Sequence, residues 1–280
     1  MKLEEMKVCA ADTLKFFIET MPDVPFTADD VVFVFAKEAD LAKRAVELCA
    51  EYCPDKILNE SQLQNLEESI LANALIGREK SAVLIRLTTL NKKAFRQLII
   101  HELTHIFCGK LEGSKGFIDI YGSGTAYEKN PEDKTHDGII VAGHDVWSEF
   151  IAQYYAVKLI DTDPFTFEDI AHNVHQSLLK VNVLRLVESK KDFSWLCSYW
   201  FNCEDFEESL AELSEPGTFI RLDLPYGEKT QKALFDCVEY IFKQMQKNKP
   251  WEINEDFIYG LGSRFMNFRL AISICTGLLV

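Results

Sequence analysis

Residues 94–107 read Ala94-Phe-Arg-Gln-Leu-Ile-Ile-His-Glu-Leu-Thr-His-Ile-Phe107, a stretch that is largely apolar outside its His-Glu-Leu-Thr-His string. This composition is typical of a helix that is buried on most sides. At about 100° per residue, His101 and His105 lie about 40° apart and one turn apart along a helix, so both imidazoles can reach one metal ion. Glu102 lies on the same side, within about 100° of His101. Two histidines and a carboxylate at this H-E-x-x-H spacing predict a catalytic zinc site.

The segments before this helix predict a mixed α and β region. Asn91 is expected to cap the helix, and Cys108-Gly109 is expected to end it. One of the predicted strands alternates, with Val83 and Ile85 on one face. The expected elements are strands at Val31–Phe35 and Ser81–Thr88, and helices at Leu3–Thr20, Asp40–Cys53 and Ser61–Leu75.

The segment after the helix, from Lys110 to Gly143, is rich in glycine and polar residues. It predicts a long irregular excursion, which could cover a cleft as a lid. Asp145 is expected to cap the next helix, which runs to about Ile160. From there the pattern is helical, with a break expected at Gly260-Leu-Gly262. The later helices are expected at Phe167–Ser189, Phe193–Leu213, Lys229–Lys247 and Asp256 to about Leu278.

This order of elements predicts an α+β fold in two lobes. Residues 1–160 are expected to form a catalytic lobe, with a small mixed sheet and the metal-bearing helix. Residues 161–280 are expected to form an all-helical lobe. The metal-bearing helix would then lie at the junction of the two lobes, on the floor of a cleft.

The composition of the 280 residues excludes some classes of binding partner. A net charge of −14 argues against nucleic acid and against an anionic membrane surface, since both carry negative charge. No apolar stretch approaches the twenty or so residues of a membrane span, and the N-terminus lacks a signal-peptide pattern. Eight cysteines without a C-x-x-C pair predict reduced thiols, so a cytoplasmic protein is expected. The sequence carries no indication of the oligomeric state.

A catalytic zinc generally takes three protein ligands, so a third must come from elsewhere in the chain. The metzincin extension is excluded, because the positions that it requires hold Cys108 and Leu111. Glu149 is the best candidate, since it shares one face of its helix with Ala152, Gln153 and Ala156, and the two alanines allow another helix to approach closely. A solvated stripe would give the same pattern. The other candidates are Glu112, His136, His144 and Asp145, with His144 the strongest of these.

The order of H-E-x-x-H and then a helix with the string Glu149-Phe-Ile-Ala-Gln-Tyr-Tyr-Ala resembles the gluzincin class of zinc metallopeptidases. It is closest to the small intracellular bacterial ImmA/IrrE-like peptidases, over about Ser81 to Ile160. The resemblance implies a zincin-like fold for the first lobe, and His101, His105 and Glu149 as zinc ligands. It also implies Glu102 as general base. Gln153 stands where many members have an aspartate that orients a ligand histidine.

The chemistry expected from such a site is hydrolysis of a peptide or protein substrate. Glu102 would take a proton from the attacking water and pass it to the leaving nitrogen. A further donor is needed for the oxyanion, and His144 and Tyr154 are the residues we favour. In this class, the strand corresponding to Ser81–Thr88 usually forms the edge of the cleft, where an extended substrate adds by main-chain hydrogen bonds. Other candidate donors are His136, Tyr155 and Tyr226.

A second interpretation is a zinc-bound protein of the same fold that does not hydrolyse anything and acts as a binding or regulatory module. The presence of Glu102 argues against it, because a binding module does not need a general base beside its metal. A third interpretation treats the motif as accidental in a helical scaffold. Metal content separates the third interpretation from the other two, and a Glu102→Gln variant separates the first two.

Overall fold

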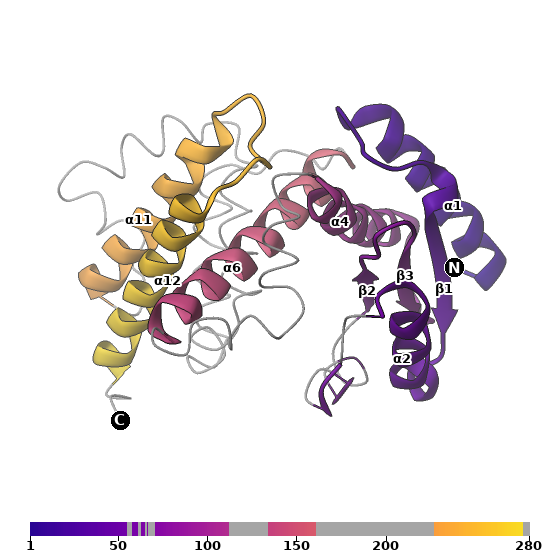
Figure 1. The fold of residues 1–280 in the computed structure, drawn as a ribbon, viewed down its shortest axis with the longest axis horizontal. Helices are drawn as coiled ribbons and strands as arrows, with labels where there is room; N and C mark the ends of the chain where they lie inside the picture. Colours follow the sequence, from indigo (N-terminus) through magenta and orange to yellow (C-terminus); the bar gives the residue numbers. More distant parts are fainter. Residues whose placement is uncertain are drawn as a thin grey trace. The chain divides into compact units, whose positions relative to one another are not determined.

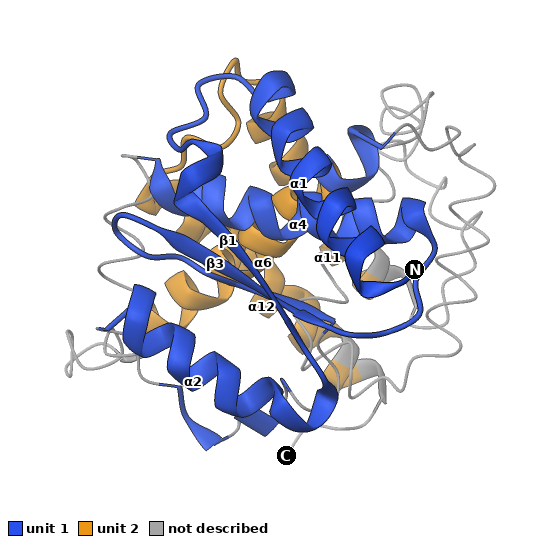
Figure 2. Ribbon diagram, turned by 90° about the vertical axis from the view of Figure 1, so that its right-hand side faces the viewer, with its two compact units in different colours: residues 1–129, 155–161 blue, residues 130–154, 162–280 orange. Residues whose placement is uncertain are grey.

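The structure is a computed structural model, which describes residues 1–54, 58–60, 63–64, 66, 71–111, 134–160 and 227–276. Over these residues the chain is mixed α and β and mostly helical, with one three-stranded sheet (Figure 1). The chain divides into unit 1, residues 1–129 and 155–161, and unit 2, residues 130–154 and 162–280 (Figure 2). The two lobes expected with a boundary at residue 160 stay a prediction.

The sheet of unit 1 is built from β1 (Val31–Ala36), β2 (Ala72–Leu75) and β3 (Ser81–Arg86). Its order is β1-β3-β2, with β1 parallel and β2 antiparallel to β3. The expected α+β class with a small mixed sheet is therefore confirmed.

The position of β3 corrects one expectation from the sequence. The strand expected at the edge of a cleft is the central strand, because it pairs with β1 along its whole length and with β2 from Ala82 to Ile85. Its backbone hydrogen bonds are therefore used on both sides. In the part of the chain that the structure describes, the edges of the sheet are β1 and β2.

Helices cover both faces of this sheet (Figure 2). Helix α2 (Leu41–Tyr52) lies on one face, where Ala82 and Leu84 belong to its hydrophobic cluster. Helices α1 (Leu3–Thr20) and α4 (Lys92–Lys110) lie on the other face. Val83 and Ile85 alternate toward that second face, and both are fully buried. The helix that carries the H-E-x-x-H motif is therefore packed directly on the sheet.

Both ends of α4 are fixed by polar contacts. At its start, the Asn91 side chain accepts a hydrogen bond of 2.8 Å from the backbone N–H of Ala94, so the expected cap is confirmed. At its end, the Lys110 ammonium donates to the carbonyl oxygens of Gly77, Arg78 and Glu79 at 3.2, 3.3 and 2.8 Å. These residues form the turn between β2 and β3, so the motif helix is tied to the sheet beyond its apolar face.

Unit 2 contains α11 (Gly227–Met245), α12 (Glu255–Thr276) and most of α6, which runs from Lys134 to Lys158. Helices α6 and α12 touch through their backbones, because a Cβ built on Gly143 would lie 2.0 Å from the carbonyl oxygen of Ile258. In turn, a Cβ on Gly262 would lie 2.0 Å from the carbonyl oxygen of Ile139. Glycine is required at both positions, since any larger residue would force the helices apart.

Three expectations from the sequence were wrong, two of them about helices α6 and α12 and one about residues 72–75. Helix α6 begins at Lys134, so the stretch up to Gly143 is helical and Asp145 lies inside the helix. Helix α12 is continuous through Gly260 and Gly262, whose small size serves helix packing. Residues 72–75, expected at the end of a helix, form β2 and owe their conformation to pairing with β3.

The other described elements match the expected ones within a few residues. The helices expected at Phe167–Ser189 and Phe193–Leu213 lie outside the described residues, as do Glu112 and Tyr226. Among the residues described, no helix combines the length and the apolar character needed to cross a bilayer.

Candidate metal centre

The two histidines of the motif face one another on α4. Their Nε2 atoms lie 3.1 Å apart, and their ring centroids lie 4.7 Å apart with the rings 82° from parallel. His101 is 8% exposed and His105 is partly buried. Zinc–nitrogen bonds are about 2.0–2.1 Å long, so two nitrogens on one ion lie at most about 4.2 Å apart. The observed separation meets this condition without any rearrangement.

Glu149 of α6 supplies the third ligand atom of the group. One nitrogen of His101, one nitrogen of His105 and one carboxylate oxygen of Glu149 all lie within 4.8 Å of one another. Two imidazoles and one carboxylate are also the ligand chemistry that zinc prefers at catalytic sites. The His-His-Glu group could therefore bind a metal ion.

The surroundings of Glu149 on α6 fit a ligand better than a solvated stripe. Glu149 and Gln153, one turn apart, are both partly buried. On the same face Ala152 is 0% exposed and Ala156 is 1% exposed, so the small residues are covered. A stripe of the surface kind would leave these positions open to water.

Glu102 lies beside the pair of histidines on the same helix and is only 5% exposed. Glu102 directly follows His101, so the two side chains lie about 100° apart around α4. A carboxylate at this depth is shielded from bulk water, which strengthens its interaction with a nearby proton or cation. The arrangement can therefore place a base next to the ion-binding group.

Of the other candidates for the third ligand, His136 lies far from Glu149. Thirteen residues of α6 separate the two, which is about 20 Å along the axis. The His136 ring instead stacks on Tyr259, with centroids 4.9 Å apart, and its Nδ1 lies 3.8 Å from the Asp137 carboxylate. Asp145 lies one turn before Glu149 on α6 and is partly buried.

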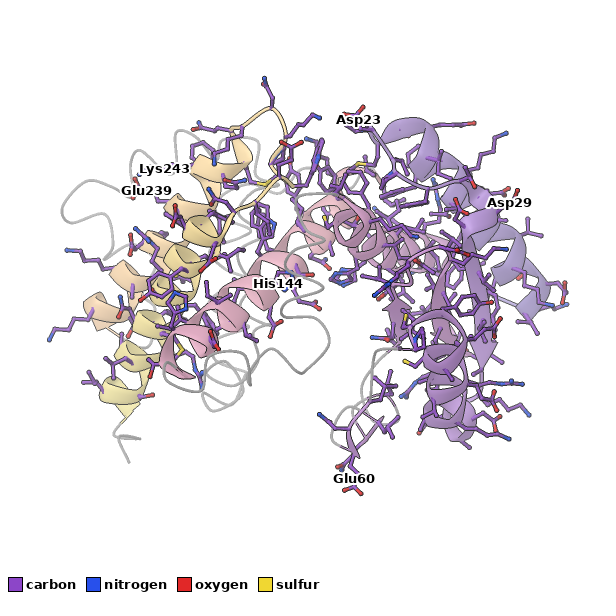
Figure 3. All side chains as sticks on the ribbon, in the orientation of Figure 1. Asp23, Asp29, Glu60, His144, Glu239 and Lys243 are labelled. Carbon is purple, nitrogen blue, oxygen red and sulfur yellow. The ribbon has the colours of Figure 1, made fainter. Side chains whose placement is uncertain are left out.

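His144 and Tyr154, the expected oxyanion donors, lie five residues before and five residues after Glu149 on α6. Each is therefore about 140° around the helix from Glu149 and does not share its face. His144 lies in the middle of α6 (Figure 3), and the Tyr154 ring stacks on Phe150 with centroids 6.1 Å apart. Tyr155 is 8% exposed. The roles expected for these residues stay predictions.

Cys108 lies on the same helix as the two histidines, and the sequence was used at this position only to place the helix end and to exclude the metzincin extension. It follows His101 by seven residues and His105 by three, so the three share one face of α4. Desolvation raises the pKa of the Cys108 thiol to about 12, so the thiol is neutral at physiological pH. The i, i+4, i+7 spacing of the three side chains could have identified it.

The chain matches no protein-family model, no curated protein and no solved structure, so the case for the site rests on its own residues.

Proposed function

We propose that this chain is a zinc-dependent peptidase of the gluzincin type, with a zincin-like fold around α4. The observation that supports the proposal most directly is the group of His101, His105 and Glu149, whose ligand atoms lie within 4.8 Å of one another. The buried carboxylate of Glu102 on the same helix supports a hydrolytic role. Together they supply the ligands and the base that metal-assisted hydrolysis requires.

Zinc, when bound, lowers the pKa of water and polarises a substrate carbonyl. The chain's own part in the reaction is the proton transfer. Glu102 accepts a proton from the water as the oxygen of the water bonds to the peptide carbon. Glu102 then gives this proton to the amide nitrogen as the carbon–nitrogen bond breaks. The buried position of Glu102 favours this role, because a base that is already held in place needs little reorganisation of its side chain and of solvent to reach the transition state.

The substrate in this proposal is an extended peptide or a protein segment. Because β3 is paired on both sides, the edge role expected for it passes to β2, which is antiparallel to β3 and packs against α4. An added strand would pair with the outer backbone groups of β2. The amide of Ala74 faces away from β3, because the hydrogen-bonded pairs alternate from Leu71 and Arg86 to Asn73 and Leu84. This part of the proposal predicts that Ala74→Pro weakens substrate binding, while zinc content stays unchanged.

The first test is metal content. Protein purified without a metal-binding tag would be analysed by mass spectrometry, together with His105→Ala, Glu149→Ala and the control Glu47→Ala. We expect about one zinc per chain in the wild type and the control, and none in the two ligand variants. Zinc that survives Glu149→Ala would refute Glu149 as a ligand. No zinc in the wild type, even after reconstitution with zinc chloride, would refute the metal site.

The second test is cleavage of a random decapeptide library, read by mass spectrometry. Wild-type protein loaded with zinc should cut peptides, and Glu102→Gln should retain zinc but lose cleavage by at least about a hundredfold. Equal cleavage by the two proteins would overturn the role of Glu102. Zinc binding without cleavage of any peptide would overturn the peptidase and leave a zinc protein that binds without hydrolysing.

A further inference from the structure

Strand β1 forms one edge of the sheet of unit 1. It pairs with β3 residue for residue from Val31 to Ala36, and in the part of the chain that the structure describes no strand pairs with its other side. Figure 2 views the molecule from the side of β1, with α1 and α2 on either side of the strand. A strand edge of this kind presents a row of N–H and C=O groups that can pair with another strand.

The direction of these backbone groups follows from the register of β1 on β3. The carbonyl oxygen of Ala36 accepts from the N–H of Leu87 at 2.8 Å, so the backbone groups of Ala36 face β3. The direction alternates along a strand, so the backbone groups of Val34 also face β3. Those of Phe33 and Phe35 therefore face outward, where a further strand would meet them.

Strand β1 lacks the features with which natural proteins protect an open edge. Its sequence, Val-Val-Phe-Val-Phe-Ala, contains no charged residue and no proline, and its register with β3 has no bulge. The side chains from Val32 to Phe35 are all apolar, and all of them are only partly buried. A long, uncharged and partly open edge of this kind favours pairing with another strand.

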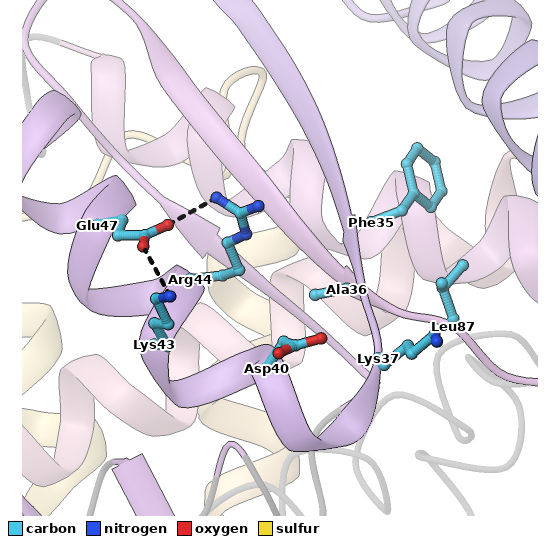
Figure 4. Close-up of a pocket in the computed structure, with 8 residues that line it drawn as sticks. All are labelled: Phe35, Ala36, Lys37, Asp40, Lys43, Arg44, Glu47 and Leu87. Atoms are coloured by element: carbon cyan, nitrogen blue, oxygen red, sulfur yellow. Dashed lines mark hydrogen bonds and ion pairs between the residues drawn. The ribbon is translucent and has the colours of Figure 1, made fainter.

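Both faces of β1 offer apolar side chains to such a strand. Val34 and Ala36 pack in the hydrophobic cluster of α2. Phe35 lies on the opposite side of the strand, away from Arg44 and Glu47 of α2 (Figure 4). An added strand that is itself apolar would therefore gain cross-strand contacts above and below the sheet.

The charges at the two ends of β1 indicate which strand fits. Asp29 lies in the short 3₁₀ helix Ala28–Asp30 before β1, and Lys37 directly follows the strand. Both are exposed, and neither forms an ion pair within the described residues. Lys37 lies beside Leu87 and apart from the charged residues of α2 (Figure 4). Two copies of β1 that pair antiparallel about Phe33 would bring the acidic end of each next to the basic end of the other.

We propose that β1 pairs with β1 of a second copy of this chain, antiparallel and about a two-fold axis at Phe33. The amide of Phe33 then donates to the carbonyl oxygen of Phe33 of the second copy, and the amide of Phe35 donates to that of Val31. The symmetry repeats every contact, so Asp29 meets Lys37 at both ends of the interface. Strand β2 lies at the opposite edge of the sheet, so this interface does not depend on the peptidase proposed above.

Sedimentation velocity of the full chain from about 1 to 200 µM would measure the association, and we expect a dimer with a dissociation constant of about 10 µM or below. Lys37→Glu and Asp29→Lys should each weaken the dimer about tenfold, because each variant opposes like charges at both ends of the interface. The double variant of Asp29→Lys with Lys37→Glu should restore the dimer, because unlike charges meet again. The control Lys15→Glu makes the same change of charge at an exposed residue of α1 and should leave the dissociation constant unchanged.

Amide hydrogen exchange, read by NMR, would locate the interface on the strand. The amides of Phe33 and Phe35 should exchange slowly in the dimer and quickly in the Lys37→Glu variant diluted until it is a monomer. The amide of Val34 should be slow in both, because it faces β3. A monomer at all concentrations up to about 200 µM would overturn the proposal, as would a dimer in which the Phe33 amide exchanges quickly. A double variant that associates no better than the single variants would refute the antiparallel register.

Discussion

Replacing Gly143 with alanine tests whether α6 and α12 touch through their backbones. The added Cβ would lie 2.0 Å from the carbonyl oxygen of Ile258, 2.8 Å from the backbone nitrogen of Gly262 and 3.0 Å from the carbonyl carbon of Ile258. Non-bonded heavy atoms come to rest about 3.5 Å apart, so the backbones would have to separate by about 1.5 Å. All three of these atoms belong to the backbone, so no side-chain rotation could relieve the contacts.

The expected loss follows from two opposing effects. Alanine is favoured over glycine inside a helix by about 1 kcal/mol. Forcing a methyl group into a closely packed contact costs about 1–3 kcal/mol, and the cost is at the upper end here because backbone atoms must move. The free energy of unfolding of Gly143→Ala should therefore fall by about 2 kcal/mol, which corresponds to a fall in Tm of roughly 4–8 °C.

Gly138→Ala is the matched control, because it makes the same substitution on the same helix. A Cβ at Gly138 would meet no atom within 4 Å, so only the gain in helix preference remains. The free energy of unfolding should rise by about 0.5–1 kcal/mol. Urea unfolding followed by circular dichroism would measure both variants against the wild type. If both variants are stabilised by the same amount, α6 and α12 do not meet at Gly143 and the reasoning is refuted.

Three further predictions concern helix α4. Lys110→Met should lower the free energy of unfolding by about 2 kcal/mol, because three backbone carbonyls lose a charged donor. The control Lys7→Met, at an exposed ion pair, should change it by less than about 0.5 kcal/mol. Equal losses in urea unfolding would contradict the role of Lys110 in holding α4 to the turn between β2 and β3. Asn91→Ala should cost about 1 kcal/mol through the lost cap, whereas Asn91→Asp should cost little, and an unchanged urea midpoint for the alanine variant would contradict the cap. The pKa of Cys108 is raised to about 12 in the folded protein, whereas in the unfolded chain the thiol ionises above about pH 8.5. The neutral thiol therefore contributes stability that is fully present below about pH 8.5 and is lost as the pH rises toward 12. Alkylation by iodoacetamide at pH 9, read by peptide mass spectrometry, should be slow at Cys108 in the folded protein and fast in urea; equal rates would contradict the raised pKa.

The elements that the sequence predicted well are those with a strong hydrophobic period. Helix α1 has the expected bounds, and its buried residues Met6, Cys9, Ala10 and Phe17 follow the spacing of one helical face. The cap at Asn91 is also local, because its side chain reaches an amide only three residues away. Such features depend on short-range geometry, which the order of residues determines directly.

The elements that the sequence missed depend on contacts from far along the chain. The strand β2 has the residues Ala-Asn-Ala-Leu, which favour a helix at least as much as a strand, and it is extended because it pairs with β3. The start of α6 contains Gly138 and Gly143, which suggested a loop. At Gly143 the small residue serves the contact with α12, so a signal of irregular structure was a signal of close packing.

The candidate metal site shows the same division between local and distant information. The helical period alone places the nitrogens of His101 and His105 on one side of α4, and the structure finds them 3.1 Å apart. Glu149 is 44 residues farther on than His105, so no local rule can bring it to them. What the sequence could supply was the chemistry of the third ligand and the small residues on its face. Ala152 and Ala156 are buried there, so the partly buried Glu149 lies among covered positions of its helix. Two imidazoles and a carboxylate with their ligand atoms within 4.8 Å of one another are a donor set that suits a metal ion, and this chemistry is the physical reason to expect one there.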